Sequence, residues 1–221
     1  MIEKKPIRLF TLCFVSTLLG IVGLLNSVSG QWSVGADVVV AIPRSDFADV
    51  TDTGTGLDLS GQYRIRSFPN VALRGDAAFI TYRYRPYSGP GYVLETRTQS
   101  IRIAMGPQFS ARYRRTELYL SPKYGLYHFY THDDIFDVYG FWMAGARNSN
   151  TEFGWNVTGG IVIGIARMPN RNFDLALHVG GSWHSISKGF KTEIDTDGDP
   201  IDVLLDVEEF CIHTGFVFHF R

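Results

Sequence analysis

The chain has 221 residues, of which 45% are hydrophobic and 19% are charged, and its formal net charge is −1. This length fits one large domain or two small ones. The balanced charge gives no support to a nucleic-acid partner, because such a partner normally requires a clustered basic excess. Two cysteines are too few for a disulfide framework or a four-cysteine metal site. The 23 glycines and the 14% aromatic content favour β structure.

The first thirty residues have the order of a secretory signal peptide. A basic start and an uncharged apolar run over 9–25 precede a Val-Ser-Gly cleavage pattern that ends before Gln31. We expect residues 1–30 to be removed and residues 31–221 to form the mature domain. The alternative is an uncleaved anchor, since a run of about 17 apolar residues is near the lower limit for spanning a bilayer. The mature domain keeps one cysteine, Cys211, so it would form no internal disulfide.

The mature sequence repeats the period-two alternation that is typical of β-strands. The last segment shows it best, with Phe216, Phe218 and Phe220 on one face and Val217 and His219 on the other. Segments of about 9–12 residues have the length of tilted transmembrane strands and exceed the average soluble strand. Eight such segments begin near Trp32, Leu57, Val71, Ile101, Glu117, Gly154, Phe173 and Phe210.

The connections between these segments alternate between short and long. Short connections, in which proline and asparagine favour turns, are expected over 66–70, 110–116 and 166–172. Longer connections are expected over 43–53, 85–95, 131–150 and 188–209. An even strand count with this alternation places both termini on the short-turn side, as in bacterial outer-membrane barrels. We therefore predict an all-β fold: a closed eight-stranded antiparallel up-and-down transmembrane β-barrel with short periplasmic turns and long extracellular loops.

Charged residues on the polar faces of the strands decide which face looks inward. A soluble lipocalin-like barrel would turn the apolar set inward, around a hydrophobic ligand. An eight-stranded barrel is just wide enough for side chains to fill it, and buried charges are tolerated only when they are paired. Four acids and four bases can form such an interior network: Asp37, Asp58, Arg64, Arg74, Asp76, Arg102, Glu117 and Lys123. Their balance favours the membrane barrel, with the soluble carrier as the alternative.

The chain resembles the small outer-membrane β-barrel domains of the OmpA/OmpX type. The signal-peptide pattern, the eight alternating segments and the Gly-Phe-Val-Phe-His-Phe ending over 215–220 carry the resemblance, and similar strands cover 74–82, 105–107 and 119–127. The resemblance implies a location in the bacterial outer membrane, contact with its lipid and lipopolysaccharide, and insertion by the outer-membrane assembly machinery. It also implies that the strand with Phe216, Phe218 and Phe220 is the assembly signal, although Arg221 follows the last aromatic residue.

Potential metal ligands are sparse. His178, His184, His213 and His219 lie on the polar faces of the last two strands, and we expect them to be hydrogen-bonded lumen residues rather than ligands. Asp195, Asp197 and Asp199 resemble part of a calcium loop within a connection of net charge −6. Pro200 stands where the EF-hand spacing requires glycine, so this stretch is a weak metal candidate. No cofactor is expected.

The neighbouring His184 and Ser185 suggest a hydrolase, because some small outer-membrane barrels modify lipid A. Adjacent residues of a regular strand point to opposite faces, so these two side chains cannot act together. The sequence therefore predicts no catalytic residue.

The long connections are the expected functional surfaces. The segment 131–150 carries Phe136, Tyr139, Phe141, Trp142 and Met143, which either form an adhesive apolar tip or extend the strands. We predict a non-enzymatic protein with a filled polar lumen and an envelope-structural or surface-interaction role, and a possible extracellular ligand at 131–150 and 188–209. The alternative is a narrow pore for small solutes.

Overall fold

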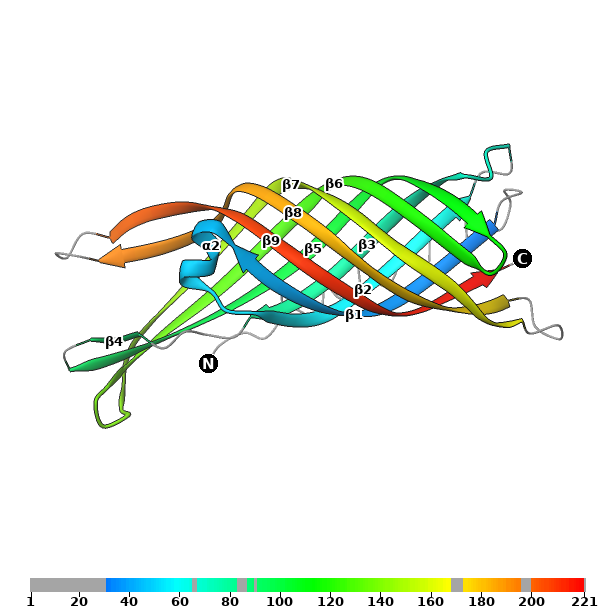
Figure 1. Cartoon of the computed structure of the whole chain (residues 1–221). Coiled ribbons are helices and arrows are strands. Elements are labelled where there is room, and N and C mark those ends of the chain that lie inside the picture. Colours follow the sequence, from blue (N-terminus) through cyan, green and yellow to red (C-terminus); the bar gives the residue numbers. More distant parts are fainter. Residues whose placement is uncertain are drawn as a thin grey trace, which may run out of the picture. The chain divides into compact units, whose positions relative to one another are not determined.

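The computed structural model describes residues 31–64, 67–82, 87–89, 91–167, 173–195 and 200–220. Its elements in chain order are β1 (Gln31–Arg44), α2 (Ser45–Val50), β2 (Gly54–Arg64), β3 (Val71–Tyr82), β4 (Tyr87–Gly89), β5 (Tyr92–Tyr113), β6 (Thr116–Asp137), β7 (Trp142–Arg167), β8 (Phe173–Asp195) and β9 (Pro200–Phe220) (Figure 1). The predicted signal peptide, residues 1–30, lies outside the described residues. Within the described ranges, no helix has both the length and the apolar content needed to cross a bilayer.

Eight strands close into an antiparallel ring. The first strand, β1, pairs with both β2 and β9, while β3 pairs with β5, and the other members of the ring pair with their neighbours in the chain. The short β4 pairs with β5 within the connection that leads to it. The predicted closed eight-stranded barrel is confirmed.

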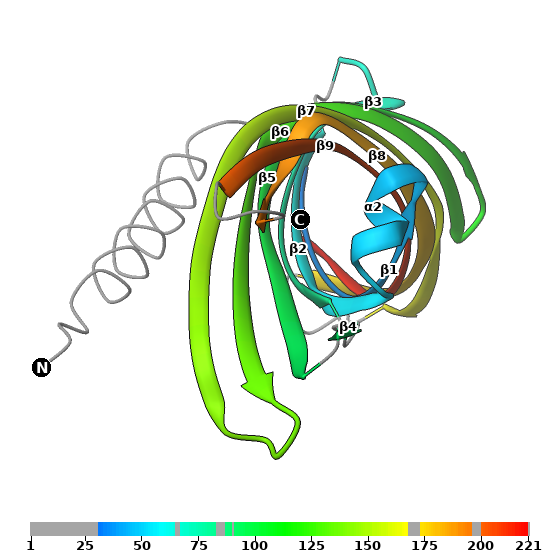
Figure 2. The same cartoon turned by 90° about the vertical axis from the view of Figure 1, so that its left-hand side faces the viewer.

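The two ends of the barrel differ in their connections. We call the end that holds Gln31, Phe220 and the β2–β3, β5–β6 and β7–β8 connections the turn end, and the opposite end the hairpin end. At the hairpin end, β6 and β7 stay paired as far as Phe136 and Trp142, and β8 and β9 as far as Asp195 and Pro200. The β6–β7 hairpin bends away to one side of the ring at this end (Figures 1 and 2).

The predicted bounds of two long connections are therefore wrong. Most of 131–150 and much of 188–209 is paired β structure rather than loop. Backbone hydrogen bonds between the strands of a hairpin continue beyond the barrel wall, where no apolar face is required. Beyond the barrel wall the residues no longer alternate between apolar and polar. The sequence pattern alone therefore predicts a loop for these residues.

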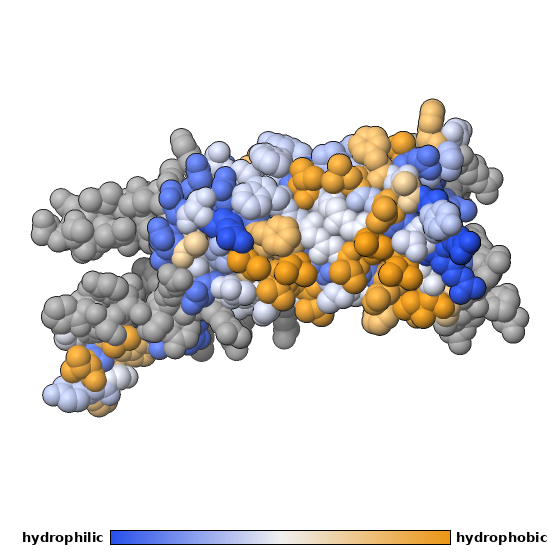
Figure 3. Space-filling view, in the orientation of Figure 1, coloured by the Kyte–Doolittle hydropathy of each residue, from blue (hydrophilic) through white to orange (hydrophobic). Residues whose placement is uncertain are grey.

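The outer face of the barrel is apolar (Figure 3). Large apolar side chains project outward from every strand of the ring, among them Val38, Leu57, Leu73, Ile103, Leu118, Ile161, Val179 and Phe216. A soluble protein rarely exposes a contiguous apolar surface of this extent, whereas a lipid bilayer accommodates it. The barrel therefore crosses a membrane with its apolar set outward, and the alternative of a soluble carrier with an apolar interior is wrong.

The first hairpin-end connection contains a short helix that covers the lumen. The side chain of Phe47 in α2 is fully buried and lies edge-on to Tyr82 and Phe129, at ring-centroid distances of 5.4 and 5.9 Å. Buried residues of β1, β3, β6, β8 and β9 complete this cluster. Figure 2 shows α2 inside the ring of strands at the hairpin end. The lumen is thus closed on this side by an apolar plug.

A close backbone approach occurs where the ring closes between β1 and β9. Gly215 pairs with Asp37, and a Cβ at this position would collide with the backbone of Ala36 and Asp37. At Gly61 in β2, a Cβ would meet nothing within 4 Å. There is therefore no room for a side chain at Gly215, whereas there is room for one at Gly61.

We predict that Gly215→Val destabilises the barrel, whereas the matched variant Gly61→Val does not. Overpacking of this kind costs about 1–3 kcal/mol, and here the clash is with backbone. The measurement is the temperature at which the folded species converts to the unfolded species on SDS gels. A lower conversion temperature for Gly215→Val alone agrees with the register; equal temperatures for both variants contradict it.

Candidate functional site

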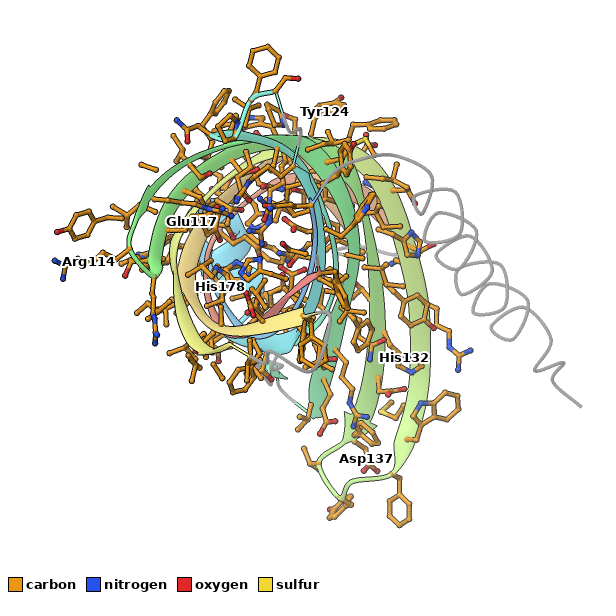
Figure 4. All side chains as sticks on the ribbon, turned by 90° about the vertical axis from the view of Figure 1, so that its right-hand side faces the viewer. Arg114, Glu117, Tyr124, His132, Asp137 and His178 are labelled. Carbon is orange, nitrogen blue, oxygen red and sulfur yellow. The ribbon has the colours of Figure 1, made fainter. Side chains whose placement is uncertain are left out.

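The lumen is filled by charged and polar side chains from all around the ring. The structure places all eight residues of the predicted interior network on the inner face, with side chains at most 10% exposed where they form ion pairs. Glu117 and His178 point into the ring, whereas Tyr124 and Arg114 point away from it (Figure 4). Charged side chains buried in the lumen are stable only with partners. The site is therefore described by its ion pairs and hydrogen bonds.

Nearest the turn end, Glu117 holds two arginines. Its Oε1 accepts a hydrogen bond from Arg64 Nη2 at 2.5 Å, and its Oε2 accepts one from Arg112 Nε at 2.6 Å. Gln108 links this group to the next, because it donates to Glu117 Oε1 and accepts from Arg74 Nη1, each at 3.4 Å.

In the middle of the lumen, Asp76 bridges two cations. Arg74 Nε donates to Asp76 Oδ1 at 2.8 Å, and Lys123 forms an ion pair with Oδ2. Five of the eight predicted residues, those of the Glu117 and Asp76 groups, therefore pair within the predicted set.

The other three predicted residues pair outside the set. Asp37 lies 2.8 Å from His178 Nδ1, and Asp58 lies 3.4 Å from His213 Nδ1. The partner of Arg102 is Glu209, whose carboxylate also accepts a hydrogen bond from the Tyr82 hydroxyl at 2.6 Å.

The assignment of Glu209 to the external acidic loop is wrong. Its side chain is 0% exposed and belongs to the lumen. Glu209 ends an acid-rich stretch of the sequence, and because of its acidic neighbours it was assigned to the loop rather than to the lumen. An available signal was parity, since Glu209 has the same parity as Cys211 and His213 on the inner face of β9.

A serine, a histidine and an aspartate align in the lumen. Ser182 Oγ lies 2.7 Å from His213 Nε2, whose other ring nitrogen faces Asp58, and it also lies 2.7 Å from His184 Nε2. His184 and Ser185 are neighbours in β8 and point to opposite faces, as expected. Ser182, which lies two positions before His184, points to the same inner face as His184.

The serine of this alignment is buried beside a small cavity. Ser182 is 1% exposed, and the adjoining cavity, lined in part by Ser182, His184 and His213, has a volume of about 20 Å³, room for a single water. In this place the alignment supplies hydrogen bonds to the lumen network.

Among the described residues, two groups of buried side chains bring potential metal ligands together, and the second of them is Asp37, Asp58 and His213. Ligand atoms of His184, Glu209 and Cys211 lie within 4.8 Å of one another, but the Glu209 carboxylate is already bound by Arg102. Of the acidic stretch, Asp195 ends β8 opposite Pro200, and Asp197 and Asp199 lie outside the described residues.

The predicted assembly strand is β9. Its Phe216, Phe218 and Phe220 are 36–49% exposed. The last two pack against Phe173 of β8, at ring-centroid distances of 5.8 and 6.2 Å. These rings therefore form part of the outer face next to the turn end.

The tip of the β6–β7 hairpin is apolar and held by a defined turn. Val138, Tyr139, Phe141, Trp142 and Met143 are 59–84% exposed. The carboxylate of Asp137 accepts backbone hydrogen bonds from Tyr139 and Phe141 at 2.9 and 2.8 Å. Gly140 has a φ of 84°, a conformation that favours glycine. The tip is thus a preformed turn that presents apolar side chains outward.

We predict that Arg102→Met destabilises the barrel by about 3–5 kcal/mol, because it leaves the Glu209 charge buried without a counter-ion. The double variant Arg102→Met/Glu209→Gln is expected to recover most of this loss. Arg97→Gln is the control, because Arg97 is largely exposed and its pair with Glu95 is worth about 0–1 kcal/mol. The measurement is the free energy of unfolding from lipid vesicles in urea. Equal losses in the single and double variants contradict the pairing.

Comparison with known proteins concerns the fold. No family model and no curated protein matches the sequence. Among solved structures, the chain is similar to Ail, the attachment invasion locus protein of Yersinia pestis (16% identity, TM-score 0.49, 87% of this chain and 100% of that chain). It is also similar to Neisserial surface protein A (16%, 0.47, 87% and 99%) and to the outer membrane protease OmpT of Escherichia coli (10%, 0.43, 88% and 97%).

Identities this low bear on the fold alone, and the fold rests on the chain's own features. The strand pairing closes a ring of eight strands, and the large apolar side chains project from its outer face. The chain has the fold that its resemblance to small outer-membrane barrels predicts, a closed eight-stranded transmembrane β-barrel.

Proposed function

We propose that this chain is a non-enzymatic protein of the bacterial outer membrane that attaches to an apolar surface outside the cell. In this proposal the turn end faces the periplasm, the outer face contacts outer-membrane lipid and lipopolysaccharide, and the hairpin end faces outward. Barrels of this membrane have short periplasmic turns and longer external connections, which supports the orientation. The assembly machinery would recognise the outward rings of Phe216, Phe218 and Phe220 in β9.

The exposed tip of the β6–β7 hairpin carries the proposal. Burial of a large apolar side chain contributes about 1.5–3 kcal/mol, so the five tip residues together offer a substantial gain on contact with an apolar surface. The turn formed by Asp137 and Gly140 holds them in place beforehand, which lowers the entropic cost of binding. The outer leaflet of another cell's membrane is the surface that we propose, because tyrosine and tryptophan side chains such as Tyr139 and Trp142 suit the boundary between headgroups and acyl chains.

The lumen supports a structural barrel rather than the alternative of a pore. The plug around Phe47 closes the hairpin end, and the charged groups of the middle are bound to one another. The central cavity among the described residues has a volume of about 20 Å³, room for about one water. The closure at the hairpin end also supports a non-enzymatic role, because Ser182 is buried in the lumen.

We predict that replacing the tip aromatics in the triple variant Tyr139→Ser/Phe141→Ser/Trp142→Ser abolishes attachment to lipid surfaces. The measurement is co-flotation of nanodisc-embedded protein with phosphatidylcholine vesicles. The matched control is Phe68→Ser/Tyr113→Ser, which removes two exposed aromatic residues from the turn end. Wild type and control are expected to float with the vesicles, and the triple variant is not. Equal flotation of all three, or none by the wild type, contradicts the proposal.

We predict that the wild-type protein gives no single-channel steps in planar bilayers, because ion pairs occupy the lumen. Insertion is verified in the same bilayers by protease protection of the protein. Reproducible steps from verified protein would support the narrow pore instead.

A further inference from the structure

Two buried acids of the lumen lie opposite each other near the closure of the ring. Asp37 of β1 pairs directly with Asp58 of β2, and the two residues are only 2% and 3% exposed. Like charges directly opposite each other on neighbouring strands are destabilising. The register thus brings two carboxylates together where water is scarce, and a cation bound between them would remove their repulsion.

These two acids differ from the other acids of the lumen in their partners. Asp76, Glu117 and Glu209 each form an ion pair with arginine or lysine. Among the described residues, Asp37 and Asp58 form ion pairs only with histidines, whose imidazoles carry a charge only when they are protonated. A divalent cation would match the two negative charges of this pair of acids.

The carboxylate of Asp58 has an oxygen without a partner. Its Oδ2 lies 3.4 Å from His213 Nδ1, which is longer than an ordinary N–H···O hydrogen bond. Its Oδ1 is buried and has no hydrogen-bond partner among the described residues. A buried acceptor that is left unsatisfied is costly, and more so when it belongs to a charged group. A cation bound by this carboxylate would satisfy it.

His213 completes a set of three potential metal ligands. It lies on β9, which pairs with β1 along the edge opposite to β2. One ligand atom from each of Asp37, Asp58 and His213 lies within 4.8 Å of the other two. Small side-chain rotations would bring all three to bonds of about 2.0–2.2 Å with one ion.

Hydrogen bonds outside this set orient two of the ligands. Ser182 Oγ lies 2.7 Å from His213 Nε2, so that His213 Nδ1 is the nitrogen nearer the acids. The carboxylate of Asp37 lies 2.8 Å from His178 Nδ1. Metal-binding histidines and carboxylates usually have such second partners, which fix their orientation.

We propose that Asp37, Asp58 and His213 bind one divalent transition-metal ion, for which zinc is the probe. The imidazole ligand favours a transition metal over magnesium or calcium. Three protein ligands leave the fourth position of a tetrahedral zinc ion open. The cavity of about 20 Å³ that Asp58 and His213 line has room for a water there. The ion connects β2, β1 and β9 where the first and last strands of the ring meet.

The test is refolding of the full chain from urea into phosphatidylcholine vesicles in the presence of zinc chloride. Zinc is present during folding because the plug around Phe47 closes the hairpin end and because ligands from separate strands come together only on folding. Surface zinc is then removed with EDTA, and the zinc that remains per chain is measured by inductively coupled plasma mass spectrometry.

We expect one zinc ion per chain in the wild type and none in the double variant Asp58→Asn/His213→Gln. The matched control is Asp134→Asn/His132→Gln, which removes a more exposed acid–histidine pair and is expected to keep one ion. The proposal is overturned if the wild type retains no zinc, if the control loses it, or if the folded Asp58→Asn/His213→Gln variant keeps one ion per chain.

X-ray absorption at the zinc edge identifies the ligands in the wild type, so the test does not depend on the folding of a variant. We expect only oxygen and nitrogen ligands, at about 2.0–2.2 Å from the ion. A sulfur ligand at about 2.3 Å would place the ion at the group of His184, Glu209 and Cys211 and would also overturn the proposal.

Discussion

The pairing of charges inside a closed ring of strands is the constraint on which the rest of this structure depends. A barrel whose outer face is apolar must place its polar residues inside, where water is scarce and an unpaired charge is costly. Here each buried acid described above has a cationic or hydrogen-bonding partner from a different strand or from two positions along the same strand. Some of these pairs connect strands that are not neighbours in the ring, such as β5 and β9 through Arg102 and Glu209.

The lumen has three layers with different chemistry. An apolar plug around Phe47 closes the hairpin end, ion pairs fill the middle, and an open cavity beside Arg64, Arg112 and Glu117 lies at the turn end. Because of this layering, the hairpin end can contact apolar surfaces through the β6–β7 tip without opening the lumen.

The fold could be predicted from the sequence because a membrane strand needs a strict period of two. Val38 and Val39 illustrate the limit of that reasoning, since both are apolar but only the first faces outward; their faces follow from neighbours such as Asp37 rather than from their own chemistry. The interior charges could be predicted as a set, whereas the partners of Asp37, Asp58 and Arg102 depend on cross-barrel distances that no local pattern records. The helix α2 and the extension of β8 and β9 were not predicted, and the extension of β6 and β7 was one of two alternatives, because residues beyond the membrane lack alternation.

The placement of Val34, Val38 and Val39 gives the most direct test of the central claim. The claim is that the polar residues of the strands face the lumen and the apolar residues face lipid. The measurement is intermolecular nuclear Overhauser effects between lipid acyl chains and valine methyl groups in methyl-labelled protein in nanodiscs. The account predicts transfer from the acyl chains to the methyls of Val34 and Val38, which are 45% and 53% exposed, and none to those of Val39, which is fully buried. Acyl-chain transfer to Val39, with none to Val34 and Val38, would contradict the account.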